Sequence, residues 1–414
     1  MDYNKAIEKL FSLHTFGIKL GLDNIKNFLN LINNPQDKLK IFHIAGSNGK
    51  GSTSSFIASI LMEMGKKVGL YTSPHFVRFN ERIKINNVEI PNEYTAEFFT
   101  KHEDYIFENE LTFFEVTTAL AFEYFSSQKV DYAVIETGLG GRLDATNVTT
   151  PLASVITSIS LEHTNVLGET LAEIAFEKGE IIKPNSKAFI SLLPEEAERV
   201  IIDKCKTVDV PLFKLKDYII EDKQLVGLKK ENLIFSIETL GLKGEYQKLN
   251  ASLAILVLKE ILNVNNFDII KKGLKNVVKN TGIQGRYEYF YREPDIIFDS
   301  AHNLEGVENF LNEFTKETKY RKKYLLFTAM KDKSIKPMLQ KLNETFDEIH
   351  ITEIDYERAA KLEYIEDIAK ELRIKVYPES DYIDFIENFK QKQPNKCLVV
   401  LGSMYMLGYI KSKI

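Results

Sequence analysis

The stretch from residue 41 to residue 64 constrains the fold more than any other part of the chain. It opens with an apolar run, 41–45, typical of a short buried strand, and then breaks into a glycine-rich loop, 46–52. Apolar residues at helical spacing follow and predict a helix. A strand, a glycine loop and a helix in this order form a phosphate cradle, because backbone N–H groups and the helix N-terminus both attract an anion.

The loop residues favour nucleotide binding over a simple tight connection. Lys50 would reach the outer phosphates of a nucleotide, and a nearby hydroxyl can hold magnesium. The strict pattern G-x-x-x-x-G-K-[ST] is not met, because Ile44 stands at the place of its first glycine. In addition, Gly51 separates the lysine from Ser52. The expected ATP-binding residues of the loop are Asn48, Gly49, Lys50, Gly51 and Ser52, with Lys50 also expected to be catalytic.

The segment HIAGSNGKGST, residues 43–53, resembles the phosphate loop of the Mur-type amide ligases. Within that superfamily it is most similar to the folylpolyglutamate synthase/dihydrofolate synthase family. The resemblance continues over nearly the whole chain. It implies an α/β fold, in which a P-loop nucleotide-binding domain with a mostly parallel sheet precedes a smaller Rossmann-like α/β domain. It also implies ATP as a substrate and Mg²⁺ as a cofactor.

Composition agrees with an ordinary enzyme of two domains. The chain has 414 residues, which is long for one core, and 44% of them are hydrophobic. The formal net charge of −5 provides no global basic field for nucleic acid or an anionic membrane. Its two cysteines, Cys205 and Cys397, lie outside any CxxC pattern and argue against disulfides and zinc. The charged N-terminus and the lack of a long apolar run predict a cytoplasmic protein, expected to be a monomer.

Three segments resemble parts of the family that face the folate. Residues 72–91 concentrate polar side chains between strand-like pieces, which is typical of a substrate loop but also of an exposed hairpin. Two helices are expected within 3–33, joined by a loop over 15–21 that contains Lys19-Leu20-Gly21. Another helix is expected over 112–125, although its aromatic residues alone would more often be core. The resemblance implies that Ser73 binds magnesium and that the substrate contacts are Leu20, Gly21, Arg82, Phe114 and Glu115.

A buried strand over 132–135 ends in Glu136 and the glycine-rich run 137–144. Ligands of doubly wound sheets gather where strands end, and a carboxylate near a phosphate loop can hold magnesium. The acid could equally cap a glycine turn. The run ETGLGGRLDATN resembles the family closely and implies that Glu136 binds the metal, and that Arg142 and Asp144 face the pterin.

His163 and Lys178 become candidates only through the resemblance. A lone histidine at a strand end is usually structural, and Lys178 by itself would be a solvated helix lysine. The family pattern implies that His163 is a metal ligand and that Lys178 forms a carbamate with carbon dioxide, an anionic oxygen ligand for magnesium. Both are expected to be catalytic. Here Gly179-Glu180 replaces the usual Ala-Gly, so Glu180 adds negative charge near Lys178.

The rest of the chain divides near residues 280–284. Before that point, 187–214 predicts strand, helix and strand, and 216–246 a hairpin. Asn250 could be only a helix N-cap, whereas the resemblance implies a nucleotide contact. The expected domains are an ATP-binding central domain, 1–283, and a C-terminal glutamate-ligase domain, 284–414.

Strands and helices alternate from 295 to 401 and predict a second, smaller parallel sheet. It contains no G-x-G-x-x-G, so dinucleotide binding is unsupported. The motif FDSAHN, 298–303, could be an ordinary strand end. A Ser-His-Asp hydrolase is not supported, because the motif has no nucleophile elbow. The resemblance implies nucleotide contacts by Arg286, Asp299 and His302, with Arg286 also catalytic through its charge on the phosphate.

The function implied is ATP-dependent addition of L-glutamate to a folate through an acyl phosphate, with tetrahydrofolate as acceptor and dihydropteroate left open. Two other classes stay open. One is another Mur-type ligase with a different amino-acid acceptor, and the other is a P-loop ATPase that is not a ligase. The cluster of Arg286, Asp299 and His302 argues against the ATPase, because an ATP switch does not require it.

Overall fold

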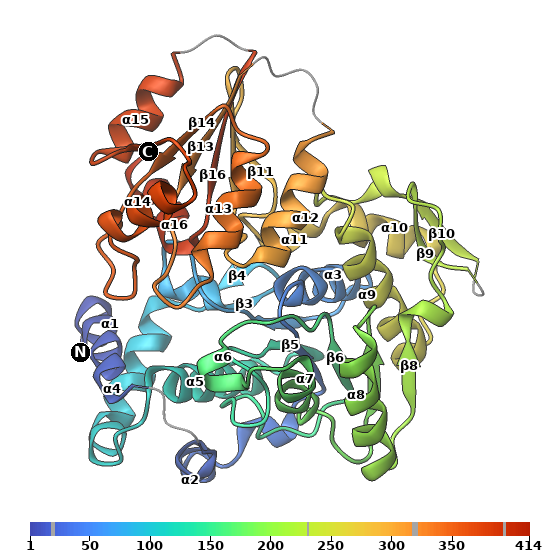
Figure 1. The fold of residues 1–414 in the computed structure, drawn as a ribbon. Helices are drawn as coiled ribbons and strands as arrows, with labels where there is room; N and C mark the ends of the chain where they lie inside the picture. Colours follow the sequence, from blue (N-terminus) through green and yellow to red (C-terminus); the bar gives the residue numbers. More distant parts are fainter. Residues whose placement is uncertain (18–20, 230–231, 317–321, 392–394) are drawn as a thin grey trace. The chain divides into compact units, whose positions relative to one another are not determined.

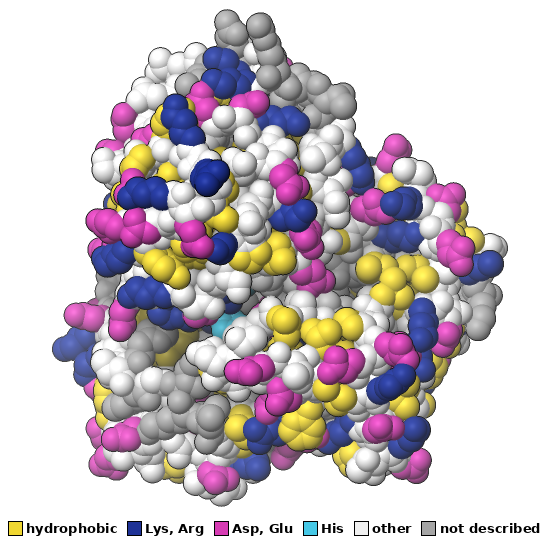
Figure 2. Space-filling model, viewed as in Figure 1, with side chains coloured by type: hydrophobic (Ala, Val, Ile, Leu, Met, Phe, Trp, Pro, Cys, Tyr) yellow, Lys and Arg dark blue, Asp and Glu magenta, His cyan; other side chains and the backbone are white. Residues whose placement is uncertain are grey.

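The structure, a computed structural model, describes residues 1–17, 21–229, 232–316, 322–391 and 395–414. Leu20, expected to contact substrate, lies outside these residues. Within them, no helix has the length and apolar character needed to cross a membrane. Acidic and basic side chains are interspersed over the face shown in Figure 2.

Contacts divide the chain into two units (Figure 1). The first unit comprises Met1–Gly241 and Gln247–Ile283, and the second comprises Leu242–Tyr246 and Gln284–Ile414. The short segment Leu242–Tyr246 was placed in the first domain by the sequence, but it groups with the second unit. Lys243 Nζ, for example, donates to the hydroxyl of Tyr289 at 3.1 Å.

An eight-stranded sheet organises the first unit, in the order β4-β3-β2-β5-β1-β6-β7-β8. At its centre, β1 (Ile41–Ala45) pairs in parallel with β5 (Tyr132–Glu136) and β6 (Ala153–Ile156). All five residues of β1 are buried, which explains why all of them except His43 are apolar. Among the described strands of this sheet, β3 is antiparallel to its neighbours β2 and β4, and the other pairs are parallel. The other strands are β2 (Val68–Tyr71), β3 (Ile83–Ile85), β4 (Val88–Glu89), β7 (Lys187–Ile190) and β8 (Leu212–Lys214).

Helix α3 (Lys50–Glu63) is buried on nearly every side, because α9, α10 and α11 contact it as well as the sheet. The helix α4 (Asn92–Glu108) was not anticipated from the sequence. A hairpin, β9 (Leu225–Leu228) and β10 (Leu233–Ser236), forms where one was expected. The remaining helices of the first unit are α1 (Tyr3–Ser12), α2 (Asp23–Leu31), α5 (Phe113–Ser127), α6 (Thr164–Leu167), α7 (Leu171–Gly179), α8 (Glu195–Thr207), α9 (Gln247–Leu262), α10 (Phe267–Lys275) and α11 (Val277–Thr281).

The second unit contains a six-stranded sheet in the order β11-β12-β16-β13-β14-β15, which confirms the expected Rossmann-like fold. Among the described strands of this sheet, only the edge strand β11 is antiparallel to its neighbour. Its strands are β11 (Glu288–Tyr291), β12 (Asp295–Asp299), β13 (Lys322–Phe327), β14 (Glu348–Ile351), β15 (Val376–Pro378) and β16 (Lys396–Leu401). Its helices are α12 (Leu304–Phe314), α13 (Ile335–Asn343), α14 (Leu362–Glu371), α15 (Tyr382–Phe389) and α16 (Met404–Lys413).

Candidate active site

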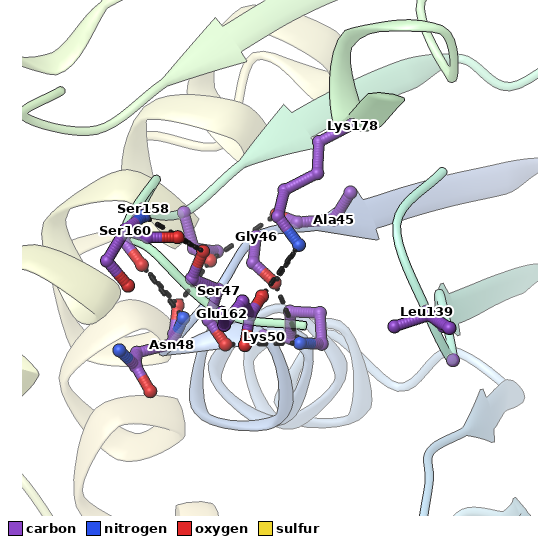
Figure 3. A network of polar contacts seen from close by, with 12 residues as sticks. Ala45, Gly46, Ser47, Asn48, Lys50, Leu139, Ser158, Ser160, Glu162 and Lys178 are labelled. Atoms are coloured by element: carbon purple, nitrogen blue, oxygen red, sulfur yellow. Dashed lines mark hydrogen bonds and ion pairs between the residues drawn. The ribbon is translucent and has the colours of Figure 1, made fainter. Parts of the chain in front are cut away.

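The phosphate loop follows β1 directly and is tied to the segment that follows β6. The N–H of Ser47 donates to the carbonyl oxygen of Ser158 at 2.9 Å, and the N–H of Asn48 donates to the Ser158 hydroxyl at 2.8 Å (Figure 3). The hydroxyl of Thr157 donates to the carbonyl oxygen of Asn48 at 2.6 Å. These bonds fix the conformation of the loop against the segment that follows β6. No sequence pattern indicated this support.

Lys50 stands at the first turn of α3 and folds back over the loop. Its Nζ donates to the carbonyl oxygens of Gly46 at 2.7 Å and Ser47 at 3.3 Å. The ammonium group and the N-terminal amides of α3 therefore converge on the loop. That combination is a ready anion site, since both carry positive charge toward the same place.

Asn250 lies inside α9, which begins at Gln247, so the alternative that it is an N-cap is wrong. Its Oδ1 accepts from the Thr53 hydroxyl at 3.3 Å, and its Nδ2 donates to the Gln247 side chain at 3.0 Å. Helix α9 thus brings an amide from far along the sequence to the first turns of α3.

Gly49 provides a direct test of this contact. It has a φ of +85°, and a Cβ added there would lie 2.5 Å from Asn250 Oδ1. Gly65 after α3 has a φ of +75°, yet its Cβ would meet nothing within 4 Å. We expect Gly49→Ala to raise the KM for ATP several-fold and Gly65→Ala to show only the backbone cost of about 1–2 kcal/mol in unfolding free energy. Equal ATP KM values for the two variants would contradict this geometry.

Ser73 and Glu136 meet beside the phosphate loop, as expected. Glu136 ends β5 and lies opposite Ile44 in the register of β1. Its Oε2 accepts from the N–H of Ser73, which follows β2, at 3.3 Å. His163 follows β6, the other neighbour of β1, and has a left-handed backbone with φ 46°. Ser73 and Glu136 thus meet at neighbouring strand ends, whereas His163 lies further along, at the N-cap of α6.

The donor set fits magnesium that binds together with a nucleotide. Among the described residues, no group of three or more His, Cys, Asp or Glu side chains could hold a metal ion. Magnesium usually takes one or two carboxylates and completes its shell with water and substrate phosphates. A buried carboxylate, Glu136, next to a phosphate cradle and the serine Ser73 matches that requirement.

Lys178 is buried with 1% of its surface exposed, so the alternative of a solvated helix lysine is wrong. Its Nζ donates to Glu162 Oε1 at 2.8 Å and to the carbonyl oxygen of Gly46 at 3.2 Å (Figure 3). Lys50 donates to the same carbonyl oxygen, so two lysines converge on one point. Burial lowers the pKa of Lys178, and Glu162 opposes that shift.

Of the two acidic residues near Lys178, Glu162 pairs with it and Glu180 pairs with another lysine. Glu180 accepts from Lys204 Nζ at 2.6 Å and takes no part in the buried pair, because residues two apart on a helix face different directions. Glu162 is the partner of Lys178 in the buried pair, and the sequence pattern did not point to it. Burial by itself would raise the pKa of Glu162, but Lys178 and then Lys50 hold it well below its usual range.

The loop after β5 gathers the residues expected on the folate side. A Cβ on Gly138 would lie 2.5 Å from the ring of Phe114, so ring and loop are in close contact. Arg142 pairs with Glu177 of α7, with Nε 3.0 Å from Oε1. Asp144 is buried and accepts from the N–H of Gly138 at 2.8 Å. Its observed role is therefore to hold the loop.

Two other expected substrate residues have structural partners. Glu115 Oε2 accepts from the N–H and the hydroxyl of Thr112, at 2.8 and 2.9 Å, and forms a capping box at the start of α5. Arg82 donates from Nε to His75 Nδ1 at 2.8 Å and lies 5.1 Å from the Phe113 ring centroid. Gly21 borders residues 18–20, which are not described. These contacts place Arg82 beside the helix that carries Phe114.

In the second unit, Arg286, Asp299 and His302 gather around Ser300 at the carboxyl end of β12. Arg286 donates to the Ser300 hydroxyl, and His302 Nδ1 lies 2.9 Å from the Ser300 carbonyl oxygen. Asp299 accepts from the N–H of Tyr287 at 2.8 Å. Burial raises the pKa of Asp299 to about 6, although the hydrogen bond from Tyr287 and the positive charge of Arg286 both lower it. The sequence had not singled out Ser300 as the centre of this cluster.

Comparison with known proteins identifies the family. Residues 44–258 match the family model of the Mur ligase middle domain, and residues 285–404 match that of the Mur ligase, glutamate ligase domain. A curated relative, the dihydrofolate synthase/folylpolyglutamate synthase of Bacillus subtilis (strain 168), is 35% identical and covers 96% of both chains. The chain belongs to the dihydrofolate synthase/folylpolyglutamate synthase family of Mur ligases. The family expected from residues 43–53 is thereby confirmed.

Solved structures of this family share the fold. The chain resembles Mycobacterium tuberculosis folylpolyglutamate synthase complexed with ADP, with a TM-score of 0.89, 25% identity, and coverage of 100% of this chain and 99% of that one. It also resembles a bifunctional folylpolyglutamate synthase/dihydrofolate synthase of Yersinia pestis complexed with AMPPNP and Mn ion. There the TM-score is 0.84, the identity 25%, and the coverage 100% and 98%. The two-domain α/β fold expected from the sequence is confirmed.

Proposed function

We propose that this protein is an ATP-dependent amide ligase that adds L-glutamate to a folate. The observation that carries the proposal is the phosphate cradle at the end of β1, with Lys50 folded over it and Glu136 beside it, in a chain of this ligase family. The loop after β5 contacts the ring of Phe114 and carries Arg142, and Asp144 holds that loop in shape, which suits a flat aromatic ligand with a polar edge.

The reaction joins two anions before it forms an amide. A folate carboxylate oxygen attacks the γ-phosphorus of ATP, and ADP leaves with the electrons of the broken bond. The glutamate amine then attacks the carbonyl carbon of the acyl phosphate, loses a proton, and displaces inorganic phosphate. The first step needs positive charge and positioning more than covalent help from the protein. Lys50 and the N-terminus of α3 provide that charge.

Magnesium, when bound with the nucleotide, supplies further neutralisation of phosphate charge. Ser73, Glu136 and His163 would hold it, together with Lys178 as a carbamate. The carbamate forms when the neutral amine attacks the carbon of carbon dioxide, makes an N–C bond and releases a proton. Burial and the nearby charge of Lys50 both disfavour the ammonium form of Lys178, which supports this assignment, whereas Glu162 opposes it.

The acceptor is tetrahydrofolate in this proposal, and dihydropteroate is a second acceptor because the Bacillus subtilis relative is named for both activities. ADP release measured with glutamate and each acceptor separately tests this. Another Mur-type ligase would show no dependence on folate, and a simple ATPase would release ADP without folate or glutamate. A monomeric state and a cytoplasmic location stay predictions.

We also propose that Arg286, Asp299 and His302 bind the nucleotide. Arg286→Ala and Asp299→Ala are expected to lower turnover by roughly ten- to a hundredfold, because each removes a charge that orders the strand-end cluster. The control is Arg292→Ala, which removes an exposed arginine of the same unit and should leave turnover unchanged. Unchanged kinetics in both test variants would favour a second unit that binds a ligand independently.

A further inference from the structure

His43 is a buried titratable group that the reaction outlined above does not use. It lies in the middle of β1, is 0% exposed, and pairs in register with Ile135 of β5 and Ser154 of β6. An imidazole at the centre of an apolar sheet is costly unless it is hydrogen-bonded. Its partner therefore indicates what it does.

That partner is Thr146, in the loop after β5. His43 Nε2 lies 2.7 Å from Thr146 Oγ1, and the Thr146 hydroxyl donates to Asp144 Oδ1. A hydroxyl has one proton, and here that proton goes to Asp144. We therefore assign the proton of His43 to Nε2, which donates to Thr146 Oγ1.

The other ring nitrogen agrees with this assignment. His43 Nδ1 has no hydrogen-bond partner among the described residues, and a bare acceptor is less costly there than an orphan N–H. Burial, with a smaller contribution from Lys183, lowers the pKa of His43 to about 3. The ring is thus neutral at ordinary pH, and the hydrogen bonds keep one direction, from His43 through Thr146 to Asp144.

Asp144 connects these hydrogen bonds to the backbone of the loop after β5. Its Oδ2 accepts from the N–H groups of Gly138 and Leu139, at 2.8 and 2.9 Å. Gly138 contacts the ring of Phe114, and Arg142 lies a few residues further along the same loop. This series of hydrogen bonds thus begins at His43 on the buried central strand. It ends at the backbone that supports the proposed folate contacts.

We propose that His43 is a positioning residue, acting through Thr146 and Asp144 to fix the backbone at Gly138 and Leu139. Only the naming of folate as the ligand of this loop rests on the proposed function. The hydrogen-bond chain would order the loop whatever ligand it meets. His43 itself touches neither substrate nor reacting atoms in this proposal.

Paired variants at two positions separate this role from simple core packing. His43→Leu removes the donor, whereas His43→Gln keeps an N–H near the position of Nε2. Thr146→Val removes the hydroxyl at nearly constant shape, whereas Thr146→Ser keeps it. We expect His43→Leu and Thr146→Val to raise the folate KM about tenfold with little change in the ATP KM, as loss of a buried hydrogen bond would produce. The Gln and Ser variants should stay within about threefold of the parent protein.

The double variant His43→Leu/Thr146→Val tests whether the two residues act as one chain. Its folate KM should be no higher than that of the worse single variant, because both substitutions break the same connection. Multiplied effects would overturn the proposal. An ATP KM that rises as much as the folate KM would also overturn it, because a general loss of structure has that result.

Hydrogen exchange gives a readout that does not depend on activity. Without any ligand, the amides of Gly138 and Leu139 should exchange faster in His43→Leu, and also in Thr146→Val, than in the parent protein, while amides of α9 stay unchanged. Unchanged exchange at both loop amides would overturn the proposal. If the parent protein shows no folate-dependent ADP release, the proposed function fails, and the exchange result still decides the role of His43.

Discussion

Lys50→Ala is expected to lower kcat/KM for ligation by about a thousandfold or more, with the fold preserved. Lys50 donates to the carbonyl oxygens of Gly46 and Ser47 and holds its charge over the phosphate loop. Removing it takes away positive charge where the folate carboxylate and the γ-phosphate must approach one another. The measurement is folate- and glutamate-dependent ADP release under saturating ATP.

The matched control for this variant is Lys38→Ala. Lys38 is an exposed lysine shortly before β1, and its removal leaves the loop untouched. Thermal unfolding of both variants shows whether any activity loss comes from unfolding. Near-normal turnover by folded Lys50→Ala would mean that the glycine loop is not the phosphate site.

The second large effect concerns Lys178. If it carries a carbamate, activity should fall in buffer depleted of carbon dioxide and return when bicarbonate is added. Lys178→Ala should be nearly inactive, and a small carboxylate such as acetate should restore part of the activity, because it supplies the missing anionic oxygen. Full activity of Lys178→Ala without acetate would contradict the proposed carbamate.

The buried pair makes stability part of the same experiment. In the protein without the carbamate, the Lys178 ammonium pairs with Glu162, and their side chains are 2% and 5% exposed, so Lys178→Ala leaves a buried carboxylate without its partner. Such a loss costs about 3–5 kcal/mol in unfolding free energy. Lys178→Met/Glu162→Gln should recover much of that stability and none of the activity. Lys204→Ala, which breaks the separate pair with Glu180, should leave activity unchanged.

The central part of the site was predictable because its pattern is local. A strand, a glycine loop and a helix follow one another within residues 41–64, and propensity and periodicity decide each of them. The approach of Glu136 to the loop was also predictable, since carboxyl ends of neighbouring parallel strands meet at one edge. The register of Glu136 against Ile44 confirms that neighbourhood.

Non-local partners could not be predicted in this way. Glu162 pairs with a lysine 16 residues away, and no spacing distinguishes it from other acids near a strand end. Strand β16 comes last in the chain but lies between β12 and β13, an order that the sequence does not encode locally. The chain from His43 through Thr146 to Asp144 spans over a hundred residues, and it depends on the same sheet pairing.

The start of α5 carries a local capping signal in the sequence. Thr112 and Glu115 form the spacing T-x-x-E directly before an apolar run, which predicts a capping box. The structure contains that box, so at least one Glu115 oxygen is engaged by backbone and hydroxyl donors. A substrate contact by Glu115 therefore remains a prediction for its other oxygen.

The acyl phosphate is the central chemical claim, and isotope transfer tests it most directly. A folate acceptor labelled with heavy oxygen in its reacting carboxylate is incubated with ATP, magnesium, glutamate and the protein. Mass spectrometry of the released phosphate then reports where the carboxylate oxygen went. The mechanism predicts a single labelled oxygen in each phosphate for every amide formed. Unlabelled phosphate, or phosphate release that does not require the folate, would contradict the account.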